Sequence, residues 1–290
     1  CVLSCDQCSV GWLIGLVPTL GALHAGHRSL IYALVAREGV TVVSVFVNPA
    51  QFAPHEDFDR YPRAFEADCT LIAEAGGVAV YAPDAMAMYP KGYATYVEVT
   101  GLQDGLCGKT RPHFFRGVAT VVTKLFNAVD PDRAYFGLKD GQQSVIIERM
   151  ARDLDFGVEI VTVPTVREAD GLAMSSRNAY LSAEERERGL GISRALFRGL
   201  EMMEAGETDA GRILEEVRGG LGGVEIDYVD LVDTVELKPV ERVEGPVMLA
   251  VAALVGSTRL IDNVRFEPVA QKVMEVGERV GRVEVEVNCL

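Results

Sequence analysis

The stretch "VPTLGALHAGHRSL" (residues 17–30) decides the fold. The continuous apolar run "GWLIGLVP" precedes the turn, and "HRSLIYALVAREG" follows it with the spacing of an amphipathic helix and a terminal Gly39. This order predicts a buried strand, a glycine-rich turn and a helix. Two of the four histidines of the chain, His24 and His27, lie three residues apart in that turn. The turn is therefore the first candidate for a functional site.

The same order of strand and helix repeats along the first half of the chain. The mainly apolar runs "GWLIGLVP" and "VTVVSVFVNP" both end in proline and are typical of strands buried on both faces of a parallel sheet. The alternation predicts a doubly wound α/β sheet with right-handed crossovers. The expected strands lie at residues 11–18, 40–49, 78–83, 133–137 and 158–166, and the expected helices at 27–39, 59–77, 115–131 and 141–155.

The pattern changes after "SSRNAYLS". Two helical segments are followed by three strand-like runs with turns between them, which predicts a smaller α+β domain. The helices are expected at residues 183–206 and 209–221, and the strands at 225–233, 247–256 and 258–268. We therefore divide the chain into domains at residues 1–165 and 166–290. The charged, alternating tail at 269–290 is assigned to no element.

Composition restricts the class of function. A formal net charge of −14 over 290 residues argues against broad binding to nucleic acid or to an anionic membrane, so neither partner is expected. An anionic substrate then needs a locally positive pocket. No run approaches the roughly 20 apolar residues of a membrane span, and the short run at residues 10–17 lacks the basic lead of a signal peptide. A cytoplasmic location is expected.

Three of the six cysteines, Cys1, Cys5 and Cys8, have C-x3-C-x2-C spacing. That spacing can hold an iron–sulfur cluster, as in radical enzymes that use S-adenosylmethionine. Because the three cysteines precede any recognisable fold element, incidental reduced thiols are the preferred interpretation.

In a doubly wound sheet, ligands bind beyond the carboxyl ends of the strands, and the opening stretch falls at such an end. Gly21 and Gly26 let the backbone approach a ligand closely, and the helix that follows favours phosphate at its N-terminus. His24 and His27 can hydrogen-bond phosphate oxygens as charge develops on them. The alternative is a pair of surface or capping histidines, but H-x-G-H spacing at a strand end favours a functional role.

A second motif, "FVNPAQF" (residues 46–52), follows the next strand. Turn chemistry accounts well for Asn48 and Pro49. It leaves Gln51 unexplained, because that polar residue lies between apolar neighbours.

A third motif, "FGLKDGQQ" (residues 136–143), supplies a positive charge that the acidic chain otherwise lacks at these strand ends. Lys139 provides that charge, Asp140 can accept from a ribose hydroxyl, and Gln143 belongs to the same turn. A helix start with Asp140 in its first turn is the alternative, and both can hold at once.

The stretch "MSSRN" (residues 174–178) lies between the two predicted domains. Two hydroxyls and the guanidinium of Arg177 suit a polyphosphate. The alternative is the N-cap of the next helix, which Asn178 or Ser182 can provide instead.

Together these motifs resemble one family. "PTLGALHAGH", "FVNPAQF", "RGVATVV", "FGLKDGQQ" and "READGLAMSSRN" occur in the order found in the pantothenate synthetase family, the AMP-forming pantoate–β-alanine ligases. The resemblance runs from about Gly15 to Asn263. It implies membership of the H-x-G-H nucleotidyltransferase superfamily, related in fold to class I aminoacyl-tRNA synthetases. It also implies a Rossmann-like catalytic domain, a smaller lid-like C-terminal domain and a homodimer.

The resemblance also implies residue roles. His27 is the expected proton donor, His24 and Lys139 help neutralise charge, Gln51 and Gln143 bind pantoate, and Gln51 also lies near β-alanine. Asp68 is expected near a magnesium ion. The implied ATP contacts are Leu20, Gly21, Ala22, Leu23, His24, Ala25, Gly26, His27, Gly137, Leu138, Lys139, Asp140, Val166, Met174, Ser175, Ser176 and Arg177.

The implied reaction joins pantoate to β-alanine and uses ATP with Mg²⁺. Pantoate attacks the α-phosphate to give pantoyl adenylate and pyrophosphate, and β-alanine then gives pantothenate and AMP. Attack of one anion on another requires neutralised charge and aligned reactants.

Two departures from the family pattern leave other functions open. The usual R-P-G-H-F-R-G is "RPHFFRG", with His113 and Phe114 at the altered positions, and the usual F-G-E-K-D has Leu138 in place of glutamate. One rival is another H-x-G-H nucleotidyltransferase with a different acceptor, which would not need both Gln51 and Gln143. The other is a weakly active binding homologue. An RNA-binding role is disfavoured by the acidic balance.

Overall fold

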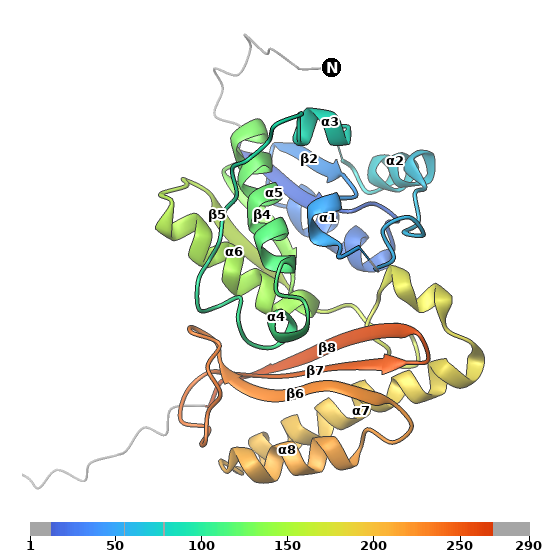
Figure 1. Cartoon of the computed structure of the whole chain (residues 1–290), viewed down its shortest axis with the longest axis vertical. Helices are drawn as coiled ribbons and strands as arrows, with labels where there is room; N and C mark the ends of the chain where they lie inside the picture. The colour runs from blue at the N-terminus through green and yellow to red at the C-terminus, as the bar shows by residue number, and fades with distance from the viewer. Residues whose placement is uncertain (1–12, 55, 78, 269–290) are drawn as a thin grey trace, which may run out of the picture.

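The computed structural model describes residues 13–268 except residues 55 and 78. One half of this part is built on a five-stranded parallel sheet with the strand order β3-β2-β1-β4-β5 (Figure 1). The chain winds outward in both directions from β1, so the predicted doubly wound sheet is confirmed. The strands are β1 (Ile14–Thr19), β2 (Val40–Val45), β3 (Ala79–Tyr81), β4 (Arg133–Gly137) and β5 (Glu159–Val163).

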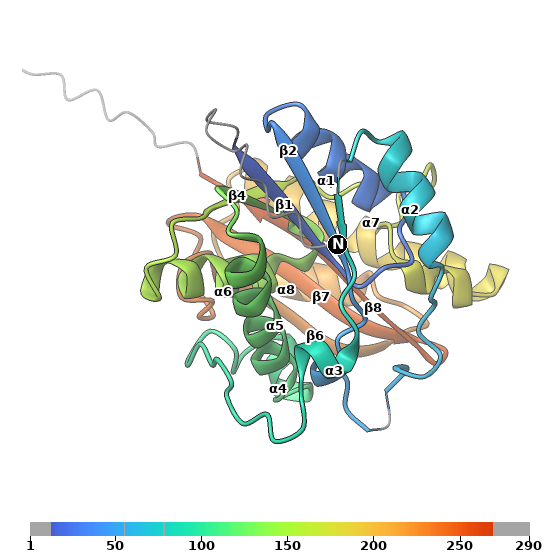
Figure 2. The same ribbon diagram turned by 90° about the horizontal axis from the view of Figure 1, so that it is seen from above.

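Helices cover both faces of this sheet. Figure 2 shows α1 (Ala25–Val35) and α2 (Phe65–Glu74) on one side, and α5 (Phe114–Val129) and α6 (Gly141–Asp153) on the other. The neighbours Leu16 and Val17 of β1 are both fully buried but belong to different cores. Leu16 packs in the core that contains α5 and α6, whereas Val17 packs in the core that contains α1 and α2. This two-sided burial explains why the strand is apolar throughout.

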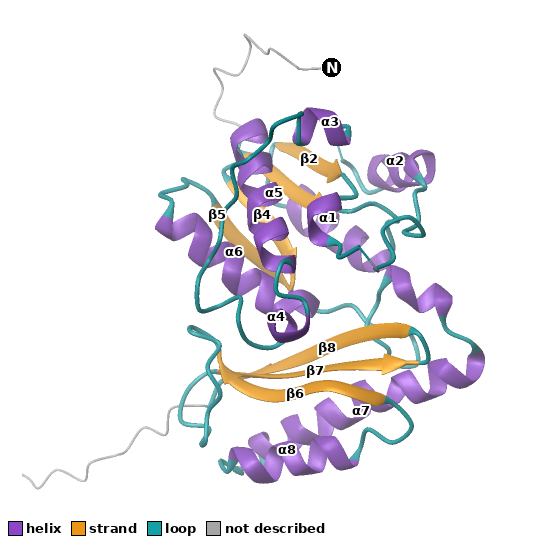
Figure 3. Cartoon of the chain, in the orientation of Figure 1, coloured by secondary structure: helices purple, strands orange, loops and turns teal. Residues whose placement is uncertain are grey.

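The C-terminal half has an antiparallel sheet with the order β6-β7-β8 and two helices under one face (Figure 3). The α+β class predicted for this region is confirmed. Its elements are α7 (Ala183–Glu204), α8 (Ala210–Gly219), β6 (Glu225–Asp233), β7 (Val247–Val255) and β8 (Thr258–Phe266).

The central strand β7 is buried on both faces. Leu249 and Val251 belong to the core formed with α7 and α8, whereas Met248 and Ala250 belong to the core that contains α5 and α6. Because side chains alternate along a strand, one face of β7 packs with α7 and α8 and the other face packs with α5 and α6 of the N-terminal half.

Some element ends differ from the sequence predictions. Helix α1 ends at Val35 rather than at Gly39, because the amides of Gly39 and Val40 already donate to the carbonyl of Leu13 at the start of the sheet. Helix α2 is shorter than the predicted 59–77, and β2 ends before the predicted 49. The segment between β3 and α5 carries two single-turn helices that the sequence did not indicate, α3 (Ala85–Met88) and α4 (Cys107–Thr110).

The predicted domain boundary at residues 165–166 falls in the irregular segment between β5 and α7, and the division into two domains stays a prediction. Cys1, Cys5, Cys8 and the tail at 269–290 lie outside the described residues. Within residues 13–268, no helix is both long and apolar enough to cross a membrane.

Candidate active site

A cavity of about 950 Å³ lies between the ends of the parallel strands and the small sheet. Residues from both halves of the chain line it, as expected for a ligand site beyond the strand ends. Among the predicted site residues, the cavity brings together Leu20, His24, Gly26, His27, Gln51, Gly137, Lys139, Asp140, Gln143, Val166, Met174, Ser175, Ser176 and Arg177. The cavity wall does not include Gly21, Ala22, Leu23, Ala25, Leu138 or Asp68. The ligand contacts of all these residues, on the wall or off it, stay predictions.

The two histidines cap helix α1 reciprocally. The backbone N–H of Gly26 donates to Nδ1 of His24 over 3.1 Å, and the backbone N–H of His24 donates to Nδ1 of His27 over 3.3 Å. The ring centroids are 4.1 Å apart. A neutral imidazole whose Nδ1 accepts a hydrogen bond carries its proton on Nε2. The cap therefore gives each ring an Nε2–H donor, so the capping that the structure shows is compatible with the predicted functional role.

The environment keeps both rings neutral. Burial, reinforced by the nearby Lys139 charge, lowers the pKa of His24 to about 4. Burial, with contributions from His24 and Lys139, lowers the pKa of His27 to about 3. Both histidines therefore donate hydrogen bonds as neutral rings at pH 7. A bound anion would raise both pKa values, because an opposite charge favours the protonated form.

These lowered pKa values predict acid sensitivity of the fold. An unfolded chain protonates each histidine below its ordinary pKa of 6.5, whereas the folded protein resists protonation until about pH 4 for His24 and about pH 3 for His27. The unfolded state then binds more protons, so stability falls as pH falls through this window, by up to about 1.4 kcal/mol per pH unit for each proton. The free energy of unfolding, measured in urea at each pH across this window, should fall less steeply with falling pH in a variant that has both histidines replaced by asparagine. Equal slopes in the two proteins would contradict the prediction.

Asp68 holds the glycine-rich turn in place. Its two carboxylate oxygens accept the backbone N–H groups of Ala22 (3.0 Å) and Leu23 (2.8 Å), and its side chain is buried. The turn also requires glycine at Gly21, where φ is +84° and an added Cβ would lie 3.0 Å from Asp68. Asp68 thus has a role in shaping the predicted ATP loop that the sequence did not reveal.

The described residues offer little for a protein-bound metal ion. No cluster of three or more histidine, cysteine, aspartate or glutamate side chains suited to a metal occurs among them. Both oxygens of Asp68 are already occupied by amides. A resident Mg²⁺ held by several side chains therefore does not fit this part of the chain, and Asp68 as a metal neighbour stays a prediction.

A buried network orients Gln51. The Nδ2 of Asn48 donates to Oε1 of Gln51 over 2.8 Å and to the carbonyl of Gly117 over 3.1 Å. The Oδ1 of Asn48 accepts from the Tyr89 hydroxyl over 2.7 Å and from the Ala50 amide over 3.2 Å. With its oxygen engaged, Gln51 keeps its Nε2–H groups for a ligand. Asn48 is therefore a positioning residue as well as the N-cap of the turn.

Adjacent glutamines on α6 have different roles. Gln142 is buried, and its amide group bonds the Cys107 N–H and the carbonyls of Leu102 and Gly105 over 2.9–3.0 Å. Gln143 faces the cavity, and no hydrogen bond to another described residue satisfies its side chain. Of the two glutamines, Gln143 is therefore the one with a side chain free to meet a ligand in the cavity, and its role in binding pantoate stays a prediction.

Lys139 lies in the turn η2 (Leu138–Asp140) at the end of β4, where its side chain is mostly covered. Its Nζ is 3.7 Å from Oδ1 of Asp140. Its charge lowers the pKa values of both cavity histidines, which places the three groups at one electrostatic site. Asp140 begins α6 without a side-chain capping bond.

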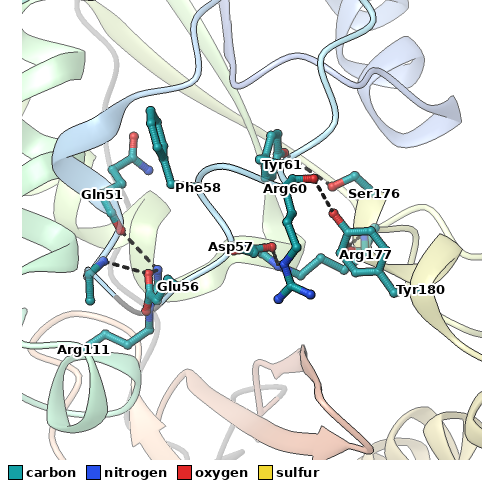
Figure 4. Close-up of polar contacts among 12 residues, drawn as sticks. Gln51, Glu56, Asp57, Phe58, Arg60, Tyr61, Arg111, Ser176, Arg177 and Tyr180 are labelled. Atoms are coloured by element: carbon teal, nitrogen blue, oxygen red, sulfur yellow. Dashed lines mark hydrogen bonds and ion pairs between the residues drawn. The ribbon is translucent and has the colours of Figure 1, made fainter.

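Arg177 is already paired with a carboxylate. Figure 4 shows its guanidinium bonding both oxygens of Asp57, at 3.1 Å from Nε and 3.0 Å from Nη2. Next to it, the Tyr61 hydroxyl lies 3.4 Å from Oγ of Ser176. A polyphosphate that engages Arg177 has to compete with Asp57, a partner that the sequence did not indicate.

A second ion pair holds Glu56, the residue directly before Asp57. Arg111 bonds both oxygens of Glu56, each at 2.6 Å, and also the carbonyl of Gln51 at 3.1 Å (Figure 4). The guanidinium stacks 3.9 Å from the centroid of the Phe114 ring. The departure from the family pattern at Phe114 therefore supplies a cation–π contact beside the cavity.

The strand order and the cavity beyond the strand ends define a Rossmann-like α/β protein with a cleft of the nucleotide-binding kind. A family model described as pantoate–β-alanine ligase matches residues 4–265. The chain belongs to the pantoate–β-alanine ligase family.

Similar proteins carry the same description. The pantothenate synthetase of Moorella thermoacetica is 55% identical over 260 residues, which cover 89% of this chain and 92% of that protein. A crystal structure of the pantothenate synthetase from Thermus thermophilus is 45% identical with a TM-score of 0.85, over 87% of this chain and 92% of that one. The Francisella tularensis pantoate–β-alanine ligase, complexed with beta-gamma ATP and beta-alanine, is 31% identical with a TM-score of 0.71, over 87% of this chain and 89% of that one.

Proposed function

We propose that this chain joins pantoate to β-alanine with ATP, forming pantothenate, AMP and pyrophosphate. The observation that carries the proposal is that one cavity collects two kinds of side chain. His24, His27 and Lys139 supply donors and positive charge, while Gln51 and Gln143 supply carboxamides. The first set suits phosphates and the second suits a small hydroxy acid.

The first step forms pantoyl adenylate. A carboxylate oxygen of pantoate attacks the α-phosphorus, and the bond from that phosphorus to the pyrophosphate oxygen breaks. The Nε2–H groups of the neutral histidines donate to phosphate oxygens, while Lys139 offsets the charge that is already present. Mg²⁺ enters as part of the Mg–ATP substrate and neutralises phosphate charge.

The second step forms the amide. The amine of β-alanine attacks the acyl carbon, AMP leaves with its phosphate oxygen, and the nitrogen loses a proton. The adenylate reacts readily with water, so the cleft has to exclude water. Met248, Ala250 and Asn263 of the small sheet line the cavity, which supports a lid-like role for the C-terminal half.

We propose a cytoplasmic location and assembly as a homodimer. Among the residues that the structure describes, the thiols of Cys69 and Cys107 form no disulfide, which is consistent with the reducing cytoplasm. A homodimer is proposed from the family resemblance.

Exchange of label between ATP and pyrophosphate tests the proposed function. We expect exchange that depends on pantoate, with AMP released only when β-alanine is added. Exchange with another carboxylic acid but not with pantoate would favour a different acceptor. ATP binding without exchange would favour the weakly active homologue.

Gln143→Ala should raise the pantoate KM about 5- to 150-fold and leave the ATP KM nearly unchanged, since a buried hydrogen bond to substrate contributes about 1–3 kcal/mol. Gln142→Ala is the matched control, because that side chain bonds only protein groups. Gln142→Ala should lower the urea concentration at the midpoint of unfolding and leave the pantoate KM nearly unchanged. Equal weakening of pantoate and ATP binding in Gln143→Ala would assign that residue a general structural role.

A further inference from the structure

The side chain of Asn263, in the small sheet, hydrogen-bonds the turn that carries Lys139. Asn263 lies in β8, and its side chain is buried. Its Nδ2 donates to the carbonyl of Leu138 over 2.9 Å and to the carbonyl of Lys139 over 2.8 Å. Both acceptors are carbonyl oxygens, so only the amide nitrogen of Asn263 can make these bonds, and its two N–H groups serve both.

The neighbours of Asn263 hold the same turn. A Cβ added to Gly141 would lie 2.5 Å from Sδ of Met248 and 3.1 Å from the Asn263 amide, so β7 and β8 pack directly against the start of α6. Two residues further along β8, Arg265 donates to Oγ of Ser144 over 3.0 Å. The turn η2 is thus fixed from the small sheet, not only from the strand that precedes it.

The preceding residue of the strand reaches the other wall of the cavity. Asp262 bonds Arg167 through both carboxylate oxygens, at 2.6 and 3.0 Å, and Arg167 directly follows the cavity residue Val166. The adjacent residues Asp262 and Asn263 therefore tie β8 to two separate segments that line the cleft.

We propose that Asn263 is a positioning residue for the adenylation step, acting through Lys139. The inference rests on the proposed function. Two carbonyl oxygens beside a phosphate site repel phosphate charge, and the Asn263 amide compensates both of them. The same two bonds fix the backbone from which the Lys139 side chain extends. A misplacement of about 1 Å at a reacting group can cost about a hundredfold in rate. The effect of Lys139 on the reaction therefore depends on the two hydrogen bonds from Asn263.

A double-mutant cycle between Asn263 and Lys139 tests the inference. The variants are Asn263→Ala, Asn263→Thr, Lys139→Ala and the two doubles, and the assay is pantoate-dependent ATP–pyrophosphate exchange. Asn263→Ala should slow exchange about ten- to a hundredfold in the native background and no more than about threefold when Lys139 is already alanine. Threonine suits a strand and keeps one donor, so Asn263→Thr should give a smaller loss and serves the cycle if the alanine variant does not fold.

A matched control and a second readout separate positioning from stability. Val264→Ala alters the adjacent β8 residue, which packs in the core with α7 and α8, and it should lower stability without slowing exchange. Amide formation from supplied pantoyl adenylate should stay near the wild-type rate in Asn263→Ala. If Asn263→Ala slows ATP–pyrophosphate exchange as much in the Lys139→Ala background as in the native one, Asn263 contacts substrate directly or acts only on stability. The inference then fails. Absence of exchange in the wild-type protein would instead overturn the proposed function.

Discussion

Replacement of His27 by alanine is expected to slow pantoate-dependent pyrophosphate release about a hundredfold or more, the usual cost of losing a preorganised donor to developing charge. The ring lines the cavity, and its Nδ1 is occupied by the His24 amide. Its Nε2–H is therefore the group offered to phosphate. Release within about threefold of the wild-type rate would contradict a role for His27 in this step.

The reciprocal cap complicates the alanine variant, because it also removes the acceptor for the His24 amide. Loss of a cap typically costs about 1 kcal/mol of stability. His27→Asn is the matched control, since its Oδ1 can still accept that hydrogen bond while the Nε2–H donor is lost. It should unfold near the wild-type temperature and be as slow as His27→Ala. Recovery of activity with asparagine would show that the cap, not the Nε2–H donor, matters for the reaction.

Lys139→Ala is expected to impair adenylation by about a hundredfold and amide formation far less, because preorganised charge acts where charge develops. Both histidines are neutral at pH 7, with pKa values of about 4 and about 3, so they cannot offset the fixed charge of a triphosphate. Lys139 can. Once pyrophosphate has formed, much of that charge has left the reacting centre.

Single-turnover measurements with supplied pantoyl adenylate separate the two steps. The Lys139→Ala variant should form pantothenate from this intermediate at close to the wild-type rate. Replacement of the exposed Lys91 by alanine gives the same change in net charge and should affect neither step. An equal loss in adenylation and in amide formation would mean that Lys139 does not act mainly on phosphate charge.

The sequence predicted the parts of the site that follow from one strand and its turn. Apolar runs that end in glycine or proline located the strand ends, and the polar residues that follow them, such as His27 and Gln51, line the cavity. Gln143 was preferred to Gln142 because of its place in the turn of Lys139 and because of the family resemblance. The structure shows the physical reason, because Gln142 is saturated by three backbone groups.

The sequence did not reveal contacts that join distant segments. Asp57 pairs with a residue 120 positions away, and Asn263 bonds carbonyls 124 and 125 positions away. No local periodicity encodes such pairs. For His24 and His27 the sequence left capping and phosphate binding as alternatives, since a reciprocal cap made by two imidazoles has the same spacing as a phosphate site.

The alternating burial of β7 limits how the chain can be divided. Met248 and Ala250 complete a core whose other members come mostly from residues far earlier in the chain. A fragment that stops before α7 would lose this apolar cover and leave the inner faces of α5 and α6 incompletely packed. We therefore expect a fragment cut where the helix and strand pattern changes to be less stable than the same segment in the full chain.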